Sequence, residues 1–276
     1  MQAKKHLGQH FLTSQKALFD MVQAGDINSD DLVLEIGPGK GVLTEKLLSL
    51  ARTVLAIEKD VELIPLLKEK FEKELGQGRL EILPKDILLF NPEILKEYNK
   101  PYKLIANIPY YITGAIIEQF LSASHQPSKM VLLIQKEVAE RIIARDQLSG
   151  NLGGKQSILS IAVSVYGTPK IVSKVPAGAF FPPPKVDSAI IVIDNISRDF
   201  FKEINLPAQA GEKTFFRVLK HCFGKKRKQI LGSLADYLEN KDKAISILQK
   251  ADISEKSRPE DLSKEDWGRI TQYIEE

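Results

Sequence analysis

Between residues 13 and 136 the sequence alternates short, β-rich apolar runs with segments of helical periodicity. Parallel strands need a long crossover connection, which is usually a helix, so this alternation predicts βαβ units. Helices on both faces bury the strands completely, which accounts for runs that are continuously apolar. We therefore expect a largely parallel sheet that is covered on both faces.

Seven β-rich segments fit this interpretation. A first helix, capped by Thr13 or Ser14 and ending near Gly25, precedes them. After residue 196 the sequence has helical patterns without strands, so we predict an α/β domain over residues 1–196 and a small all-α domain over residues 197–276. The predicted strands span 32–37, 53–58, 79–86, 103–108, 129–135, 169–175 and 186–193, and helices among them span about 41–50, 61–74, 92–99 and 113–123.

Composition excludes several classes of protein. The 276 residues are 43% hydrophobic and 27% charged, as in ordinary globular proteins. No apolar stretch reaches the roughly 20 residues of a membrane span, and the N-terminus lacks a signal-peptide core, so we expect a cytoplasmic protein with no membrane partner. Cys222 is the only cysteine and the four histidines show no ligand spacing, so we expect no disulfide and no metal.

A glycine-rich turn follows the first predicted strand, where Gly37, Gly39 and Gly41 lead into a helix. Glycines there let the backbone approach a ligand closely, although a plain tight turn is the alternative. Glu58 ends the next strand, 21 positions after Gly37, and can accept both hydroxyls of a ribose; Asp86 ends the third strand, where it can meet an adenine edge. The carboxyl ends of consecutive parallel strands line one crevice, so this set predicts a cofactor that contains adenosine.

The spacing of the glycines distinguishes between two cofactors. The dinucleotide fingerprint needs a glycine where this chain has Val42, and Glu35 stands two residues before Gly37. The shorter form resembles the first motif of class I S-adenosylmethionine-dependent methyltransferases. A helix N-terminus that holds no pyrophosphate suits a cofactor without phosphate.

The fourth predicted strand ends in Asn107, Ile108, Pro109 and Tyr110. An exocyclic amine on a base is a poor nucleophile, and two acceptors on its N–H groups can turn its lone pair toward a methyl group. The Asn107 oxygen and the carbonyl of Ile108 or Pro109 are such acceptors, and Tyr110 offers a face for stacking. An X-Pro turn is the alternative, but the position beside the cofactor residues favours a clamp for a flipped-out amino base.

Several motifs together resemble the ribosomal RNA adenine N6,N6-dimethyltransferase family. The resemblance implies a Rossmann-like class I S-adenosylmethionine-dependent methyltransferase with a mostly parallel seven-stranded sheet and a small all-α C-terminal domain. The motifs are GQHFL (8–12), EIGPGKG (35–41), AIEKD (56–60), Asp86, NIPYYI (107–112), LLIQKEVAERI (132–142) and AFFPPPKVDSAI (179–190).

By position, the resemblance implies a role for individual residues. The target adenine would be held by Asn107, Pro109 and Tyr110, with Phe180 of the proline-rich loop closing its other face; Phe181 or Phe180 would then serve only core packing. The chain departs from the family pattern at His10, Tyr111, Gln156 and Gly232. The residues implied to bind S-adenosylmethionine are His10, Leu12, Gly37, Glu58, Asp86 and Asn107.

A run of four cations, Lys225, Lys226, Arg227 and Lys228, lies in a segment predicted as one helix over residues 215–234. A solvated surface is the bland interpretation, but crowded like charges beside an adenine-reading domain favour contact with an RNA backbone. The last domain is therefore predicted to bind RNA.

The function that the resemblance implies is dimethylation of two adjacent adenosines in a hairpin near the 3′ end of small-subunit (16S) ribosomal RNA, as part of ribosome biogenesis. The expected substrate is small-subunit RNA within a partly assembled subunit, and a monomer suffices. The alternatives are a large-subunit adenine dimethyltransferase of the macrolide-resistance type, and a non-catalytic assembly or transcription factor. Intact Glu58, Asp86 and Asn107 favour retained catalysis.

Overall fold

The computed structural model describes residues 4, 8–98, 100–143, 155–206, 208–225 and 228–275. Internal contacts divide the chain into two compact units, one of residues 1–140 with 167–196 and one of residues 141–166 with 197–276. The chain passes from the first unit to the second at residue 196, and residues 141–166, which the sequence analysis assigned to the first domain, group with the C-terminal helices. Tyr166 accounts for this grouping, because its ring stacks on Phe216 and its hydroxyl donates to Glu212 Oε1 at 2.6 Å.

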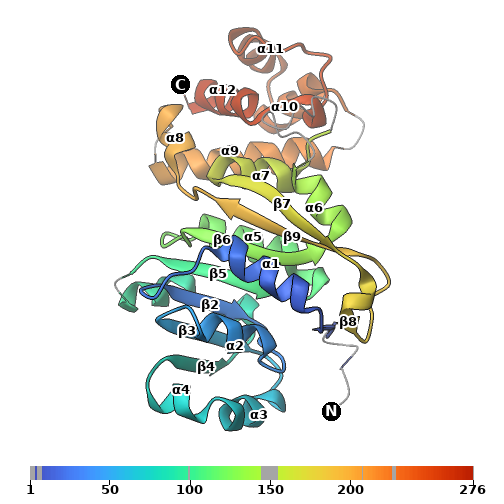
Figure 1. The fold of residues 1–276 in the computed structure, drawn as a ribbon. Coiled ribbons are helices and arrows are strands. Elements are labelled where there is room, and N and C mark those ends of the chain that lie inside the picture. Colours follow the sequence, from blue (N-terminus) through green and yellow to red (C-terminus); the bar gives the residue numbers. More distant parts are fainter. Residues whose placement is uncertain are drawn as a thin grey trace. The chain divides into compact units, whose positions relative to one another are not determined.

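The first unit contains a seven-stranded sheet in the order β4-β3-β2-β5-β6-β9-β7 (Figure 1). Adjacent strands from β4 to β6 are parallel, and β9 is antiparallel to both of its neighbours. The predicted mostly parallel, seven-stranded sheet is therefore confirmed. Its strands are β2 (Leu32–Ile36), β3 (Thr53–Glu58), β4 (Leu80–Pro84), β5 (Tyr102–Asn107), β6 (Lys129–Gln135), β7 (Thr168–Val175) and β9 (Ser188–Asp194).

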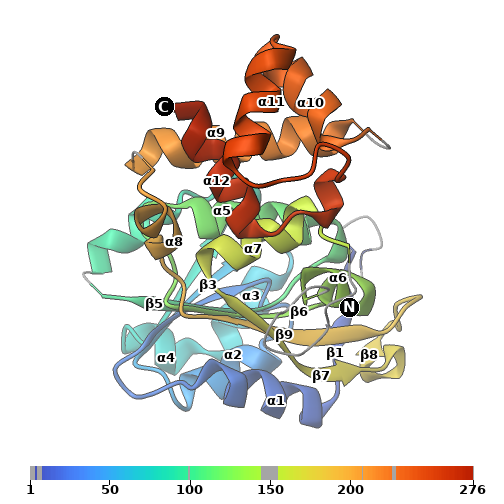
Figure 2. The same cartoon turned by 90° about the horizontal axis from the view of Figure 1, so that it is seen from above.

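Helices cover both faces of this sheet, and Figure 2 shows α1 and α2 on one face with α5 on the other. All five residues of β2 are buried, as expected for a strand covered on both sides. Helix α1 begins after Ser14, whose Oγ accepts a hydrogen bond from Ala17 N at 3.3 Å. The helices are α1 (Gln15–Gly25), α2 (Val42–Leu48), α3 (Leu63–Lys70), α4 (Glu72–Gly76), α5 (Thr113–Ser122) and α6 (Lys136–Ile143), with 3₁₀ turns η2 (Ile87–Leu89), η3 (Pro92–Tyr98), η4 (Tyr110–Ile112) and η6 (Ala177–Ala179).

The single helix predicted over residues 61–74 is wrong in one respect, because α3 and α4 divide it at Phe71. The Phe71 ring is buried in the core and its backbone leaves the helical region, with φ −117° and ψ 29°. Burial of a large ring thus outweighs local helix propensity at this position.

A two-stranded ribbon that the sequence analysis did not predict joins the N-terminal segment to the proline-rich loop. Strand β1 (Phe11–Leu12) pairs antiparallel with β8 (Phe180–Phe181), so that Leu12 lies opposite Phe180. Thr13 N adds a hydrogen bond to Ala179 O at 2.8 Å. Strands of two residues carry almost no periodic signal, which is why they escape sequence analysis.

The second unit is helical throughout its described residues, which agrees with the predicted all-α domain. Its core includes the fully buried side chains of Phe215, Leu219, Leu234 and Trp267. No helix in the described part of the chain is long and apolar enough to cross a membrane. The helices are α7 (Ile158–Tyr166), α8 (Asp199–Glu203), α9 (Ala208–Gly224), α10 (Ile230–Leu238), α11 (Lys241–Lys250) and α12 (Lys264–Glu275), with the 3₁₀ turn η7 (Pro259–Asp261).

The continuous basic helix predicted over residues 215–234 is wrong. Helix α9 ends at Gly224 and α10 begins at Ile230, so Lys225 and Lys228 lie in the connection, while residues 226 and 227 fall outside the described residues. The buried Ile230 starts the new helix, and its N–H donates to Ser257 O at 2.7 Å.

Candidate cofactor and base site

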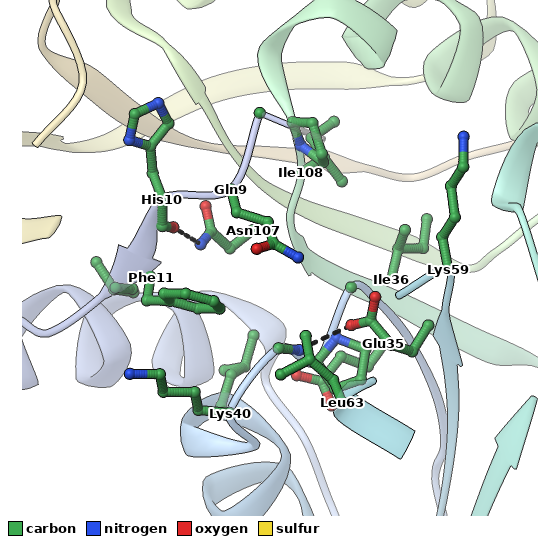
Figure 3. Close-up of a pocket in the computed structure, with 18 of the residues that line it drawn as sticks. Gln9, His10, Phe11, Glu35, Ile36, Lys40, Lys59, Leu63, Asn107 and Ile108 are labelled. Carbon is green, nitrogen blue, oxygen red and sulfur yellow. Dashed lines mark hydrogen bonds between the residues drawn. The ribbon is translucent and has the colours of Figure 1, made fainter. Parts of the chain in front are cut away.

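A cavity of about 520 Å³ lies in the first unit, at the edge where the parallel strands end. The ends of β2, β3 and β5 and the turn after β4 supply one wall, and the N-terminal segment supplies another (Figure 3). This size is in the ordinary range for small-molecule sites. Of the predicted site residues, the cavity wall includes His10, Leu12, Gly37, Glu58, Asp86, Asn107, Pro109 and Tyr110.

The glycine-rich turn has left-handed backbone torsions, with φ of 67° at Gly37 and 73° at Gly41. A Cβ on Gly41 would lie 2.5 Å from the Phe71 ring, so the tight passage from β2 to α2 requires glycine there. A Cβ on Gly37 would meet nothing nearer than Asn107 O at 3.9 Å. The backbone at Gly37 therefore borders open cavity, as the motif predicted.

Glu58 ends β3 and is held by two backbone donors. Its Oε2 accepts from Gly39 N at 3.1 Å and its Oε1 accepts from Asp60 N at 2.8 Å. Burial raises the pKa of this carboxyl, although the backbone hydrogen bonds oppose that shift. Each oxygen keeps acceptor capacity toward the cavity, which is what a pair of vicinal hydroxyls needs.

Asp86 lies just beyond β4 and caps η2, where its Oδ1 accepts from Leu88 N at 3.0 Å. Its Oδ2 lies 2.8 Å from Lys59 Nζ. This lysine holds the pKa of Asp86 below its usual value, so the carboxylate stays an acceptor at neutral pH. The charge and position suit an exocyclic amine at the cavity edge.

Asn107 connects the two walls of the cavity. Its Nδ2 donates to His10 O at 3.2 Å, which leaves Oδ1 available as an acceptor (Figure 3). The Tyr110 hydroxyl lies 2.7 Å from Ser188 Oγ, and its ring stacks with that of His10 at a centroid distance of 6.1 Å. His10 Nδ1 in turn donates to Pro182 O at 2.7 Å. These contacts fix the amide and the ring in place before any ligand arrives.

The aromatic ring expected from Phe180 does not reach the cavity. Phe180 is only 4% exposed and packs in the hydrophobic core, whereas Phe181 is 68% exposed and lines the cavity. Adjacent strand residues point to opposite sides, so pairing of β8 with β1 turns Phe180 inward and Phe181 outward. Of the two rings, Phe181 is therefore the one that lines the cavity in this structure, and the base contact implied for Phe180 stays a prediction.

Glu35 is a site residue to which the sequence analysis gave no role. It lines the cavity, is 1% exposed, and its Oε2 has no hydrogen-bond partner among the described residues. Burial raises the pKa of Glu35 to about 8, and the nearby Glu58 acts in the same direction. A carboxyl group inside the apolar run of β2 was the available signal, because burying such a group costs free energy and groups of this kind cluster at functional sites.

The N-terminal segment also contributes contacts that were not predicted. Gln9 lines the cavity, and its Nε2 donates to Asp60 Oδ2 at 2.8 Å, while Lys4 Nζ lies 2.7 Å from Asp60 Oδ1.

Among the residues that the structure describes, no group of three or more His, Cys, Asp or Glu side chains is placed to hold a metal ion.

Comparison with known proteins shows one family over the whole chain. The family model for ribosomal RNA adenine dimethylase matches residues 1–276. Among curated proteins, ribosomal RNA small subunit methyltransferase A of Dehalococcoides mccartyi is 42% identical over 271 residues, covering 98% of this chain and 88% of that protein. The protein of the same description from Clostridium botulinum is 36% identical over 270 residues, covering 98% and 93%.

Two solved structures share the fold over almost the full length. A dimethyladenosine transferase from Plasmodium falciparum has a TM-score of 0.75 and 28% identity, covering 95% of this chain and 96% of that one. The 23S rRNA methyltransferase ErmE has a TM-score of 0.70 and 26% identity, covering 96% and 100%. Both likenesses extend over the sheet and the helical part together.

Proposed function

The chain belongs to the ribosomal RNA adenine dimethylase family, and from this premise we propose that it dimethylates N6 of two adjacent adenosines in the 3′-terminal hairpin of small-subunit ribosomal RNA. The curated relatives at 36–42% identity carry the small-subunit description, which supports this target over a large-subunit one. We further propose that it acts as a monomer on a partly assembled small subunit. One observation supports the proposal most: the segment from Asn107 to Tyr110 lines the same cavity as Glu58 and Asp86.

The cavity wall fits S-adenosylmethionine in its chemistry. Glu58 would accept the ribose hydroxyls, Asp86 the adenine amine, and the open backbone at Gly37 would border the methionine part. His10, Leu12 and Asn107 would complete the contacts, so that all six predicted cofactor residues line the same cavity. When bound, the cofactor supplies an electrophilic methyl group.

The chain's own residues would prepare the base for attack. Asn107 Oδ1 and the carbonyl of Ile108 or Pro109 would accept the two N6–H bonds, so that the nitrogen lone pair turns toward the methyl group. Tyr110 would stack on the base, and its hydroxyl contact with Ser188 keeps the ring in position. No strong base is required, because the amine can lose its proton to water after attack. Positioning of this kind can lower a barrier by about 7 to 11 kcal/mol.

The basic run Lys225 to Lys228 is proposed to contact the RNA backbone. Lys228 Nζ lies 2.8 Å and Lys225 Nζ 3.7 Å from Asp236 Oδ2, so a single carboxylate faces two exposed cations. Exposed ion pairs of this kind are weak, and an RNA phosphate can compete for the same lysines. Both Lys225 and Lys228 are exposed in the connection between α9 and α10, where a phosphate can reach them.

Methyl transfer from labelled S-adenosylmethionine to unmodified small and large ribosomal subunits, followed by digestion to nucleosides, tests the proposal. We expect dimethyladenosine from the small subunit only. Label confined to the large subunit would make the chain a resistance-type enzyme instead. RNA binding without any transfer would instead favour a non-catalytic assembly or transcription factor.

A further inference from the structure

Two consecutive tyrosines in η4 have very different surroundings. Tyr110 is half-buried, and its hydroxyl contacts Ser188. Tyr111 is 64% exposed although it also lines the cavity, and its hydroxyl makes no hydrogen bond to the described residues. A large ring that is left mostly exposed on a cavity wall adds little to the core, so it is a candidate for ligand contact.

The backbone beside Tyr111 supports its ring from one side. A Cβ placed on Gly8 would lie 3.3 Å from Tyr111 Cε1, so the ring rests closely against that glycine, and Pro109 Cβ lies within 3.6 Å of the same point. Gly8 has no side chain and Pro109 is rigid, so the two residues support one side of the Tyr111 ring without covering it. A ring supported in this way loses little entropy when a planar ligand stacks on its open side.

The surroundings of Tyr111 suit a nucleotide. Lys59 and Lys85 line the same cavity, and both side chains are exposed. Lys59 Nζ lies 2.8 Å from Asp86 Oδ2, which keeps this cation at the cavity that Tyr111 also lines. Phe181 adds a second exposed ring to the cavity wall. Rings with cations beside them are what proteins use to bind unstacked bases together with their phosphates.

We propose that the Tyr111 ring is the stacking surface for the base next to the target adenine. This inference rests on the proposed function, in which one adenine leaves its stack to enter the cavity. The neighbouring base then loses a stacking partner, and the exposed ring of the residue directly after Tyr110 replaces it. Tyr110 would hold the target and Tyr111 its neighbour, so that two consecutive residues read two consecutive bases.

The first test compares Tyr111→Ala with Tyr111→Phe on unmethylated small subunits. We expect kcat/KM for the subunit to fall about tenfold in Tyr111→Ala, mainly through KM, and to stay within twofold of wild type in Tyr111→Phe. The Kd for S-adenosylmethionine should stay unchanged in both variants. Wild-type activity in the same assay establishes the proposed function separately, so its failure is distinguishable from failure of this inference.

The second test changes the RNA. In subunits whose neighbouring nucleotide is uridine, the base at that position stacks less strongly on an aromatic ring. Wild type should therefore methylate the remaining adenosine several-fold more slowly. Tyr111→Ala should show almost no further loss of rate on these subunits. Equal losses for the two enzymes would overturn the proposal, because the ring and the base would then act independently. Weaker cofactor binding in Tyr111→Ala with unchanged KM for RNA would also overturn it, and would make the ring a cover for the cofactor.

Discussion

Local contacts contribute much to the strand-end wall of the cavity, whereas the opposite wall joins segments far apart in the sequence. Glu58 accepts from Asp60 N two residues away, and Asp86 accepts from Leu88 N two residues away. The β1–β8 ribbon instead depends on contacts such as His10 Nδ1 to Pro182 O, which are 172 residues apart. The first wall is therefore set partly within each strand and its turn, with further support from Gly39 N on Glu58 and Lys59 on Asp86, whereas the second depends on pairing between distant segments. We expect substitutions in the two walls to affect cofactor and base binding differently.

The sharpest test of the ribbon compares its two phenylalanines. Phe180→Ala removes a buried core ring and should cost about 3 to 5 kcal/mol of unfolding free energy. Phe181→Ala should leave the free energy of unfolding within about 0.5 kcal/mol of wild type, yet lower kcat/KM for RNA about tenfold through lost stacking. Denaturant unfolding and methyl transfer measure the two effects. An active-site defect in a fully stable Phe180→Leu variant would return the base contact to Phe180.

Asn107 joins the two walls, so its truncation should affect catalysis most. We expect Asn107→Ala to lower kcat by at least about 100-fold, because one acceptor for the N6 amine is lost. Asn91→Ala is the matched control, since Asn91 makes only a local turn contact to Glu93 N outside the cavity. Both variants are compared by single-turnover methyl transfer and by thermal unfolding. Wild-type rates in Asn107→Ala would disprove the clamp.

Glu35 gives the strand-end wall a pH dependence. Its pKa of about 8 in the folded chain lies above the ordinary value of 4.5, so the unfolded state releases the proton first as pH rises. The stability contributed by the neutral carboxyl is complete below about pH 4.5 and is lost progressively as pH rises through about 8. Because a tenfold change in an acid dissociation constant corresponds to about 1.4 kcal/mol, the full loss of stability is a few kcal/mol.

Glu35→Gln keeps the shape of the side chain but removes the carboxyl group that titrates. We expect its thermal unfolding to match wild type near pH 5 and to occur at a higher temperature than wild type at pH 9. Glu69→Gln, on the exposed side of α3, is the control and should follow wild type at both values. If the unfolding temperatures of wild type and Glu35→Gln fell in parallel as the pH rises, the pH dependence would belong to another group, with Glu58 the first candidate.

The smallest effect is expected in the second unit, at the connection between α9 and α10. Neutralising Lys225, Lys226, Arg227 and Lys228 to Gln should reduce the slope of log Kobs against log salt for RNA by roughly 2 to 3. The Kd for S-adenosylmethionine should not change. Neutralisation of Lys241, Lys243, Lys250 and Lys256 in the same unit is the matched control. An unchanged slope in the first variant would remove these cations from the RNA interface.

Much of the sheet could be predicted because its signal is local. The bounds of β3 at Thr53–Glu58 and β6 at Lys129–Gln135 match the predicted ones, since each is a buried apolar run between polar turns. Glu58 and Asn107 are the last residues of their strands, and parallel pairing brings them to one edge. The family resemblance read from the motifs is confirmed by the family model over the whole chain.

The remaining features depend on contacts that a local pattern does not contain. Phe180 and Phe181 are the same residue type, and only pairing with β1 decides which ring is buried. Helix α9 ends at Gly224 and α10 begins at Ile230. The new helix begins there because Ile230 is buried and its N–H donates to the carbonyl of Ser257, which is distant in the sequence. The motif contains Glu35, but it does not show that this side chain is buried or that its Oε2 lacks a hydrogen-bond partner among the described residues.

The sequence alone therefore determined the strands of the large sheet, the edge at which they end together and the family, because hydrophobic periodicity and turn residues act over a few positions. Only the tertiary structure decided which aromatic ring faces the cavity, how the N-terminal segment closes one wall, and where α9 ends and α10 begins. Those outcomes depend on which distant segments pair and which side chains they bury. Such long-range packing has no counterpart in any short stretch of sequence.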